Sequence, residues 1–179
     1  PRHGAYGVAI YSRLPLERPT LVKDGRRVAG QCVAVRLEGD ETALCNVHLS
    51  SPAGIVERRA RWLGGFDANA GVRAAQWRPL REHVARTYPS ARHLIVAGDF
   101  NTLDTEQLYR TIRGRLVDAF QVEGEGRGET FPTEPTSPVP LVRIDYVFTS
   151  PALVPLEAEV LPQAGSDHRG LRVTLALAR

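Results

Sequence analysis

Two oxygen-bearing side chains follow a continuous apolar run in the middle of the chain. Residues 93–97 predict a central buried strand, and after Gly98 come Asp99 and, two residues on, Asn101. Residues two apart in an extended chain point the same way, so the two side chains can converge on one metal ion or phosphate group. Oxygen ligands of this kind suit Mg²⁺ or Mn²⁺. The alternative is that Asp and Asn simply begin a turn after the strand.

An acidic residue and a histidine, Asp167 and His168, come just before the last segment of alternating polarity. Such a pair can supply a metal-directed carboxylate together with a general acid or base. A histidine in that role usually has a carboxylate partner that fixes its tautomer. Asp145 is the candidate, because it lies in the apolar segment 143–149, where an unpaired carboxylate would be costly. A structural ion pair between Asp145 and Arg143, or another arginine, is the alternative.

A third candidate, His48, lies at the end of the alternating segment 42–49. In a strand its side chain points away from the face that carries Cys45 and Val47. It could contact a phosphoryl oxygen or protonate a leaving group. A lone histidine at a strand end is more often a structural residue, so this hypothesis depends on the other motifs.

These residues need a sheet to bring them together. Segments 28–37 and 42–49 alternate in polarity around Glu38-Gly39-Asp40-Glu41, which predicts a hairpin. Further strands are predicted at 8–11, 93–97, 116–122, 143–149 and 171–177, and helices at about 71–88 and 104–113. This order predicts an α/β (α+β) fold of sheets covered by helices, rather than a strict alternation of parallel strands and helices.

Composition indicates one ordinary folded unit. With 179 residues and 42% hydrophobic content, the chain fits a single domain over residues 1–179. A net charge of +3 favours anionic partners such as phosphate esters, nucleic acid or anionic lipid without choosing among them. A basic-aromatic cluster is either a nucleic-acid patch or, more often, a solvated loop; its members are Arg58, Arg59, Arg61 and Trp62.

The two cysteines are predicted to be buried free thiols. If the hairpin closes between Leu37 and Thr42, residue 32 lies opposite residue 47. Cys32 and Cys45 are then diagonal neighbours on one face, which fits disulfide geometry poorly. The redox compartment is left open.

The whole pattern resembles the endonuclease/exonuclease/phosphatase superfamily, which includes deoxyribonuclease I-like nucleases, abasic-site exonucleases, inositol polyphosphate 5-phosphatases and neutral sphingomyelinases. The resemblance implies a two-sheet β-sandwich flanked by helices, with four layers. Six short motifs occur in the family's order across nearly the whole chain: Gly7-Val-Ala-Ile-Tyr-Ser-Arg-Leu-Pro15, Asn46-Val-His-Leu49, Arg73-Ala-Ala-Gln76, Gly98-Asp-Phe-Asn101, Arg143-Ile-Asp-Tyr-Val147 and Ser166-Asp-His168.

The resemblance implies a Mg²⁺- or Mn²⁺-dependent hydrolase of phosphoester bonds, a nuclease-like phosphodiesterase. Its substrate would be nucleic acid, a phospholipid or a small phosphate ester. By position, Asp99 would orient or deprotonate the attacking water and contact the metal. Asn101 would bind phosphate or metal, and Asp167 would help to hold the metal.

The remaining roles fall on the histidines. His168, paired with Asp145, would stabilise the phosphoryl oxygens and share in proton transfer, and His48 would be a second phosphate contact or acid. No stable protein partner is evident, and we expect a monomer.

One departure from the family pattern concerns its opening motifs. The family begins with a strand carrying an Asn and then a Gln-Glu motif whose Glu is the main metal ligand. This sequence has no acidic residue before Glu17 and no Gln-Glu pair. We therefore expect a domain that is incomplete at its N-terminus, lacks the first strands and binds metal weakly by itself. The alternative function is a non-catalytic or inactive member that binds phosphate or nucleic acid.

A further likeness concerns location. The segments 47–52 and 128–132, the latter Gly-Glu-Thr-Phe-Pro, look like a bacterial branch whose members often carry N-terminal membrane segments. This suggests a membrane-anchored or extracytoplasmic protein, although the sequence itself leaves the compartment open.

Overall fold

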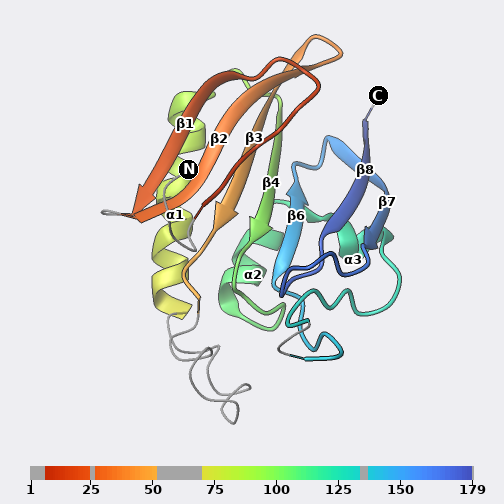
Figure 1. Ribbon diagram of the computed structural model, residues 1–179. Coiled ribbons are helices and arrows are strands. Elements are labelled where there is room, and N and C mark those ends of the chain that lie inside the picture. The colour runs from red at the N-terminus through yellow and green to blue at the C-terminus, as the bar shows by residue number, and fades with distance from the viewer. Residues whose placement is uncertain (1–6, 25–26, 52–69, 134–136, 179) are drawn as a thin grey trace.

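A six-stranded mixed sheet is the largest element of the computed structural model, which describes residues 7–24, 27–51, 70–133 and 137–178 (Figure 1). The strand order is β1-β2-β3-β4-β6-β5, in which β3 and β4 are parallel and the other neighbours are antiparallel. These strands are β1 Glu17–Asp24, β2 Arg27–Leu37, β3 Asp40–His48, β4 His93–Asp99, β5 Val117–Asp118 and β6 Asp145–Thr149. A second sheet pairs two antiparallel strands, β7 Leu153–Val160 and β8 Leu171–Leu177.

Three helices accompany the described strands: α1 Ala70–Thr87, α2 Gln107–Arg113 and α3 Ala119–Glu123. Helix α1 lies behind β1 and β2 in Figure 1, with Trp77 and Leu80 buried in the main core. Helix α3 packs against β7 and links the two sheets. No described helix combines the length and the apolar character that crossing a membrane requires.

The mixed α/β architecture predicted from the sequence is confirmed, with two local corrections. Residues 8–11 form no strand, although Asn46 Nδ2 donates to Ala9 O (2.9 Å) and ties this segment to β3. The predicted strand 116–122 divides into β5 and α3, because the Asp118 carboxylate accepts hydrogen bonds from Phe120 N and Gln121 N and so caps a helix. Strands β1 and β7 were not predicted. The four-layer sandwich remains a prediction.

The hairpin of β2 and β3 closes more tightly than the sequence suggested. Leu37 pairs with Asp40, so only Glu38 and Gly39 form the turn, and both have positive φ, 49° and 92°. Two successive positive φ values give the tight turn whose twist matches the flanking strands. A non-glycine residue such as Glu38 rarely adopts this conformation, which is why the sequence predicted a longer turn.

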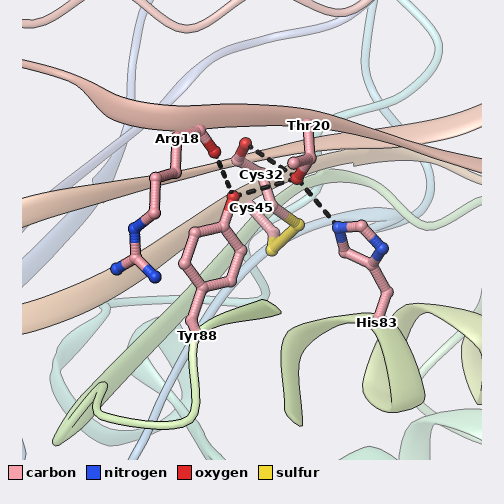
Figure 2. The surroundings of a disulfide bond; sticks show 6 residues. All are labelled: Arg18, Thr20, Cys32, Cys45, His83 and Tyr88. Atoms are coloured by element: carbon pink, nitrogen blue, oxygen red, sulfur yellow. Dashed lines mark hydrogen bonds between the residues drawn. A yellow bond between two sulfur atoms is a disulfide. The ribbon is translucent and has the colours of Figure 1, made fainter. Parts of the chain in front are cut away.

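This register overturns the prediction of free thiols. Cys32 lies directly opposite Cys45, the Cα atoms are 4.1 Å apart, and the two residues form a disulfide (Figure 2). Both are fully buried. Beside them the Thr20 hydroxyl shares hydrogen bonds with Tyr88 Oη (2.9 Å) and His83 Nε2 (2.8 Å), which join β1 to α1 and the residue just beyond it.

The main core contains a cluster of aromatic rings. The Phe100 centroid lies 5.6 Å from that of Tyr146 and 5.1 Å from that of Phe148, both edge to face. Tyr109 of α2 closes the cluster at 5.5 Å from Tyr146. Phe100 and the two β6 aromatics therefore fix the end of β4 against β6, which is where the polar candidates lie.

Candidate functional site

Three neighbouring strands place three polar candidates in one row. His48 ends β3 and pairs in register with Asp99, which ends β4, and Asp99 in turn pairs with Asp145, which begins β6. Because β3 and β4 are parallel and β6 is antiparallel, the chemistry-bearing ends of all three strands meet at the same edge of the sheet. The three side chains are half-buried, so the row is both fixed by the sheet and open to a ligand.

Asp99 and Asn101 lie together, but through the turn that the sequence offered as the alternative rather than through an extended strand, because β4 ends at Asp99 and Asn101 has a positive φ of 49°. Asn101 donates to the Asp99 carboxylate twice, from its backbone N to Oδ1 (2.8 Å) and from Nδ2 to Oδ2 (2.8 Å). A further bond from Asn101 Nδ2 to Leu49 O (3.1 Å) anchors the buried carboxamide. Both side-chain bonds are donated by Nδ2, so the Asn101 Oδ1 takes no part in these contacts.

Gly98 allows β4 to approach β3 at this point. Its φ is 131°, and a Cβ there would lie 2.1 Å from Val47 O and 2.7 Å from the Asn46 Oδ1. Any side chain would therefore force the strands apart, and with them His48 and Asp99.

His168 completes the row from the loop before β8. Its Nδ1 lies 2.8 Å from Asp145 Oδ2, a hydrogen bond in which the ring donates to the carboxylate. The predicted partnership is thus present in the geometry, and Nε2 is left for a ligand or a proton. The alternative for Asp145, a pair with Arg143, does not occur, because the Arg143 guanidinium binds Asp118 through both terminal nitrogens (3.0 and 3.1 Å).

The electrostatics of the row favour proton transfer near neutral pH. Burial, followed by the charge of Asp145, raises the pKa of Asp99 to about 7. Burial alone would lower the pKa of His168, but its hydrogen bond to Asp145 and the charge of that carboxylate outweigh it and raise the value. For His48, burial and then the charge of His168 lower the pKa. The site thus holds one histidine that favours the charged form and one that favours the neutral form.

The donor set fits a divalent cation. Ligand atoms of Asp99, Asp145 and His168 all lie within 4.8 Å of one another. Across the described parts of the chain, no arginine or lysine pairs with either carboxylate. A bound cation would therefore reduce the repulsion between Asp99 and Asp145, which contributes to the raised pKa of Asp99. Asp167, predicted as a metal ligand, is exposed and lies outside this trio.

Two other motif residues, Arg73 and Gln76 on α1, serve the scaffold. The Arg73 guanidinium binds the Glu106 carboxylate (2.6 Å). Gln76 accepts from Ser50 N (2.9 Å) and donates to the Ser50 hydroxyl (2.9 Å), which secures the chain just beyond His48. The basic cluster at 58–62 lies outside the described residues.

The sequence did not indicate the segment that contacts the loop carrying His168. Thr130 and Thr133 are buried and hydrogen-bonded to the loop that carries Asp167 and His168. The ring of Phe131 lies 4.6 Å from the His168 ring, centroid to centroid. The segment has no periodicity, and its only signal was the Gly-Glu-Thr-Phe-Pro resemblance.

Comparison with known proteins gives one consistent result. A family model described as Endonuclease/Exonuclease/phosphatase family matches residues 1–168. Among solved structures, an endonuclease/exonuclease/phosphatase family protein from Bacteroides thetaiotaomicron matches with 20% identity and a TM-score of 0.63, over 82% of this chain and 54% of that one. D. rerio TDP2 complexed with single strand DNA product matches with 16% identity and a TM-score of 0.66, over 92% and 69%.

A mannosyl-6-phosphatase from Bacteroides thetaiotaomicron also matches, with 20% identity and a TM-score of 0.57, over 83% of this chain and 57% of that one. At these identities the likeness shows the fold. The chain spans a little over half the length of the bacterial structures that it matches. Comparison with curated protein sequences gave no match.

Proposed function

Because the chain belongs to the endonuclease/exonuclease/phosphatase family, we propose that it is a divalent-metal-dependent hydrolase of phosphoester bonds. The trio of Asp99, Asp145 and His168 is the observation that carries this proposal. It combines two carboxylates, which pair with no arginine or lysine among the described residues, and a histidine whose charged form Asp145 supports. Such a set suits a reaction in which negative charge builds up on phosphoryl oxygens.

A bound Mg²⁺ or Mn²⁺ would supply Lewis-acid polarisation of the phosphoryl group and neutralise its charge. Asp99 and Asp145 would hold it, with the Asn101 oxygen as a further ligand and the exposed Asp167 contributing from the rim. The oxygen-rich donor set agrees with this choice of ion.

The protein's own groups would then divide the proton chemistry. Asp99 orients water and accepts its proton. His168 is held by Asp145 at Nδ1, so its Nε2 binds the phosphoryl oxygens or returns a proton. His48 Nε2 lies 3.6 Å from Asp99 Oδ2 and serves as a further phosphate contact or acid.

Substrate class is a finer proposal. We propose phosphodiester cleavage of a nuclease-like kind, which the matched TDP2 complex with its DNA product supports. The matched mannosyl-6-phosphatase represents a monoester alternative on the same fold. Phospholipid and small phosphodiesters share the same reacting group and belong in the same test.

The second candidate is a non-catalytic module that binds phosphate or nucleic acid. The position of Asp167 favours it, because this predicted metal ligand is exposed and lies outside the trio of Asp99, Asp145 and His168. Both candidates predict phosphate binding at the site, and only the first predicts turnover.

Hydrolysis assays separate the two. The chain is incubated with bis(4-nitrophenyl) phosphate, 4-nitrophenyl phosphate, plasmid DNA and sphingomyelin, with Mg²⁺ or Mn²⁺ and with EDTA. We expect metal-dependent cleavage of the diesters, abolished by EDTA and reduced at least ~100-fold by Asp99→Ala. Asp104→Ala, which removes an exposed carboxylate nearby, is the matched control and keeps full activity. Turnover indifferent to both EDTA and Asp99→Ala contradicts the proposal; phosphate binding without turnover favours the module.

We also propose that residues 1–179 belong to one domain of the four-layer type and that the protein is a monomer. The link from α3 to β7 and the packing of β6 near β8 support one domain. A single cooperative unfolding transition and a monomer mass in solution are the expected results.

A further inference from the structure

We propose that Thr133, with Thr130, is a positioning residue that holds His168 against Asp145. The inference rests on the proposed function, because it assigns these two threonines a task at the same site. Segment Thr130–Thr133, called the clasp below, lies between the loop that carries His168 and the strand that carries Asp145.

On the loop side, the clasp binds the backbone on both sides of His168. The Thr133 hydroxyl donates to Ser166 O (2.6 Å) and Thr133 N donates to Asp167 O (2.9 Å). Beyond the histidine, Arg169 N donates to Thr130 O (2.8 Å). Three bonds therefore fix the peptide groups before and after His168.

On the strand side, the same segment binds the start of β6. The Thr130 hydroxyl accepts from Ile144 N (3.3 Å) and Asp145 N (3.4 Å), and Thr130 N donates to Val142 O (2.9 Å). Thr130 thus contacts the backbones beside both members of the His168–Asp145 pair. Their 2.8 Å hydrogen bond is set by this shared support.

The loop itself offers little rigid support. Residues 162–167 are all exposed and lie outside regular secondary structure, whereas Thr130 and Thr133 are buried. The Phe131 ring packs beside the His168 ring at 4.6 Å. A buried clasp can therefore fix a histidine that an exposed loop alone would leave mobile, and displacements of about 1 Å at a reacting group cost activity steeply.

Matched threonine variants test the proposal. Thr133→Val removes the hydroxyl at nearly constant shape, and Thr133→Ser retains it. Thr149→Val is the control: Thr149 is also buried, on β6, and its hydroxyl donates to Leu153 O (3.1 Å), which is not part of the site. We expect Thr133→Val to lower kcat by about 10- to 100-fold while KM stays within about 2-fold. Thr133→Ser restores kcat to within about 3-fold of wild type, and Thr149→Val leaves it unchanged at a similar loss of stability.

Equal kcat values for Thr133→Val and Thr149→Val overturn the proposal while the proposed function stands. If wild type itself shows no turnover, the proposed function fails, and NMR of the His168 ring decides the clasp separately. The Nδ1–H signal of the Asp145-bonded ring is expected in wild type and Thr149→Val and broadened by exchange in Thr133→Val. The same signal in all three overturns the clasp.

Discussion

The two faces of the six-stranded sheet use the same strands for opposite purposes. Along β4, Val96 and then Phe100 are buried in the main core, while Asp99 points to the other face. Along β6, Tyr146 and Phe148 enter that core and Asp145 alternates with them. Because side chains alternate with a period of two, the chain anchors each catalytic candidate through its immediate neighbours. The aromatic core therefore supplies the positional precision that the polar end of the opposite face needs.

The faces also differ in how they treat charge. In the core, Asp118 is fully paired: it binds Arg143 through two oxygens and accepts from Tyr109 Oη (2.8 Å). Burial and the bond to Asp118 raise the pKa of Tyr109 to about 12, so the phenol stays a donor. At the site, Asp99 pairs with no arginine or lysine among the described residues, and its pKa rises to about 7. A charge compensated within the protein is structural, whereas one left for a ligand marks a functional site.

The largest effect should come from neutralising one carboxylate on each face. Asp118→Asn leaves the Arg143 charge buried without its partner and should lower the free energy of unfolding by about 3–5 kcal/mol. Asp99→Asn should instead stabilise the metal-free protein at pH 8, by about 2 kcal/mol. Chemical denaturation of both variants measures the contrast, and a loss of stability in both would contradict it.

The pH dependence follows from the same pKa. The folded value for Asp99, about 7, lies above the value of about 3.9 in the unfolded chain. Folding therefore takes up a proton between these limits, so stability falls as pH rises from about 4 to about 7 and the full cost persists above. The gain in stability of Asp99→Asn over wild type should thus be smaller at pH 5 than at pH 8. A gain that is the same at both pH values would show that the ionisation of Asp99 is not its cause.

Truncating the aromatic core should come next. Phe100 is fully buried, and Phe100→Ala should destabilise by about 4 kcal/mol through lost contacts and a cavity. Its control is Tyr11→Ala, since Tyr11 is 94% exposed and should change stability by less than about 0.5 kcal/mol. Thermal unfolding monitors both, and equal effects would show that the described core is wrong.

The disulfide should contribute somewhat less. Cys32 and Cys45 are 13 residues apart, and replacing both with Ser should cost about 3 kcal/mol on loop-closure grounds. Thiol titration of the unfolded protein should detect no free thiol before reduction and two after. Two free thiols without reduction would contradict the observed pairing.

The features that the sequence predicted correctly are those that depend on regular local backbone geometry. The position of Asp99 at the end of a buried strand and that of Asp145 among apolar residues follow from strand periodicity, and both are found in the structure. The contact between Asn101 and Asp99 instead comes from a turn, in which Asn101 has a positive φ. The hairpin register was predicted wrongly, because it depends on Glu38 adopting a positive φ, which a non-glycine residue rarely does. The disulfide was missed for the same reason.

Elements whose contacts depend on distant parts of the chain could not be predicted from the sequence either. Strand β7 carries Pro155 and two glutamates, which obscure its alternation. The threonines of the clasp lie in an irregular segment, where contacts depend on the tertiary fold rather than on a repeating pattern. The sequence therefore predicted the polar residues of the site, but not the buried segment Thr130–Thr133 that contacts the loop carrying His168.

Binding of Mn²⁺, followed by its EPR signal, tests the central claim most directly. Wild type should bind about one Mn²⁺ per chain at saturating concentration, and Mg²⁺ should displace it. Binding should be strongly weakened in Asp99→Asn and Asp145→Asn, whereas Asp118→Asn, where it folds, and Asp104→Asn should bind as wild type does. Equal binding by all of these variants, or none by wild type, would contradict the claim that Asp99 and Asp145 form a cation site.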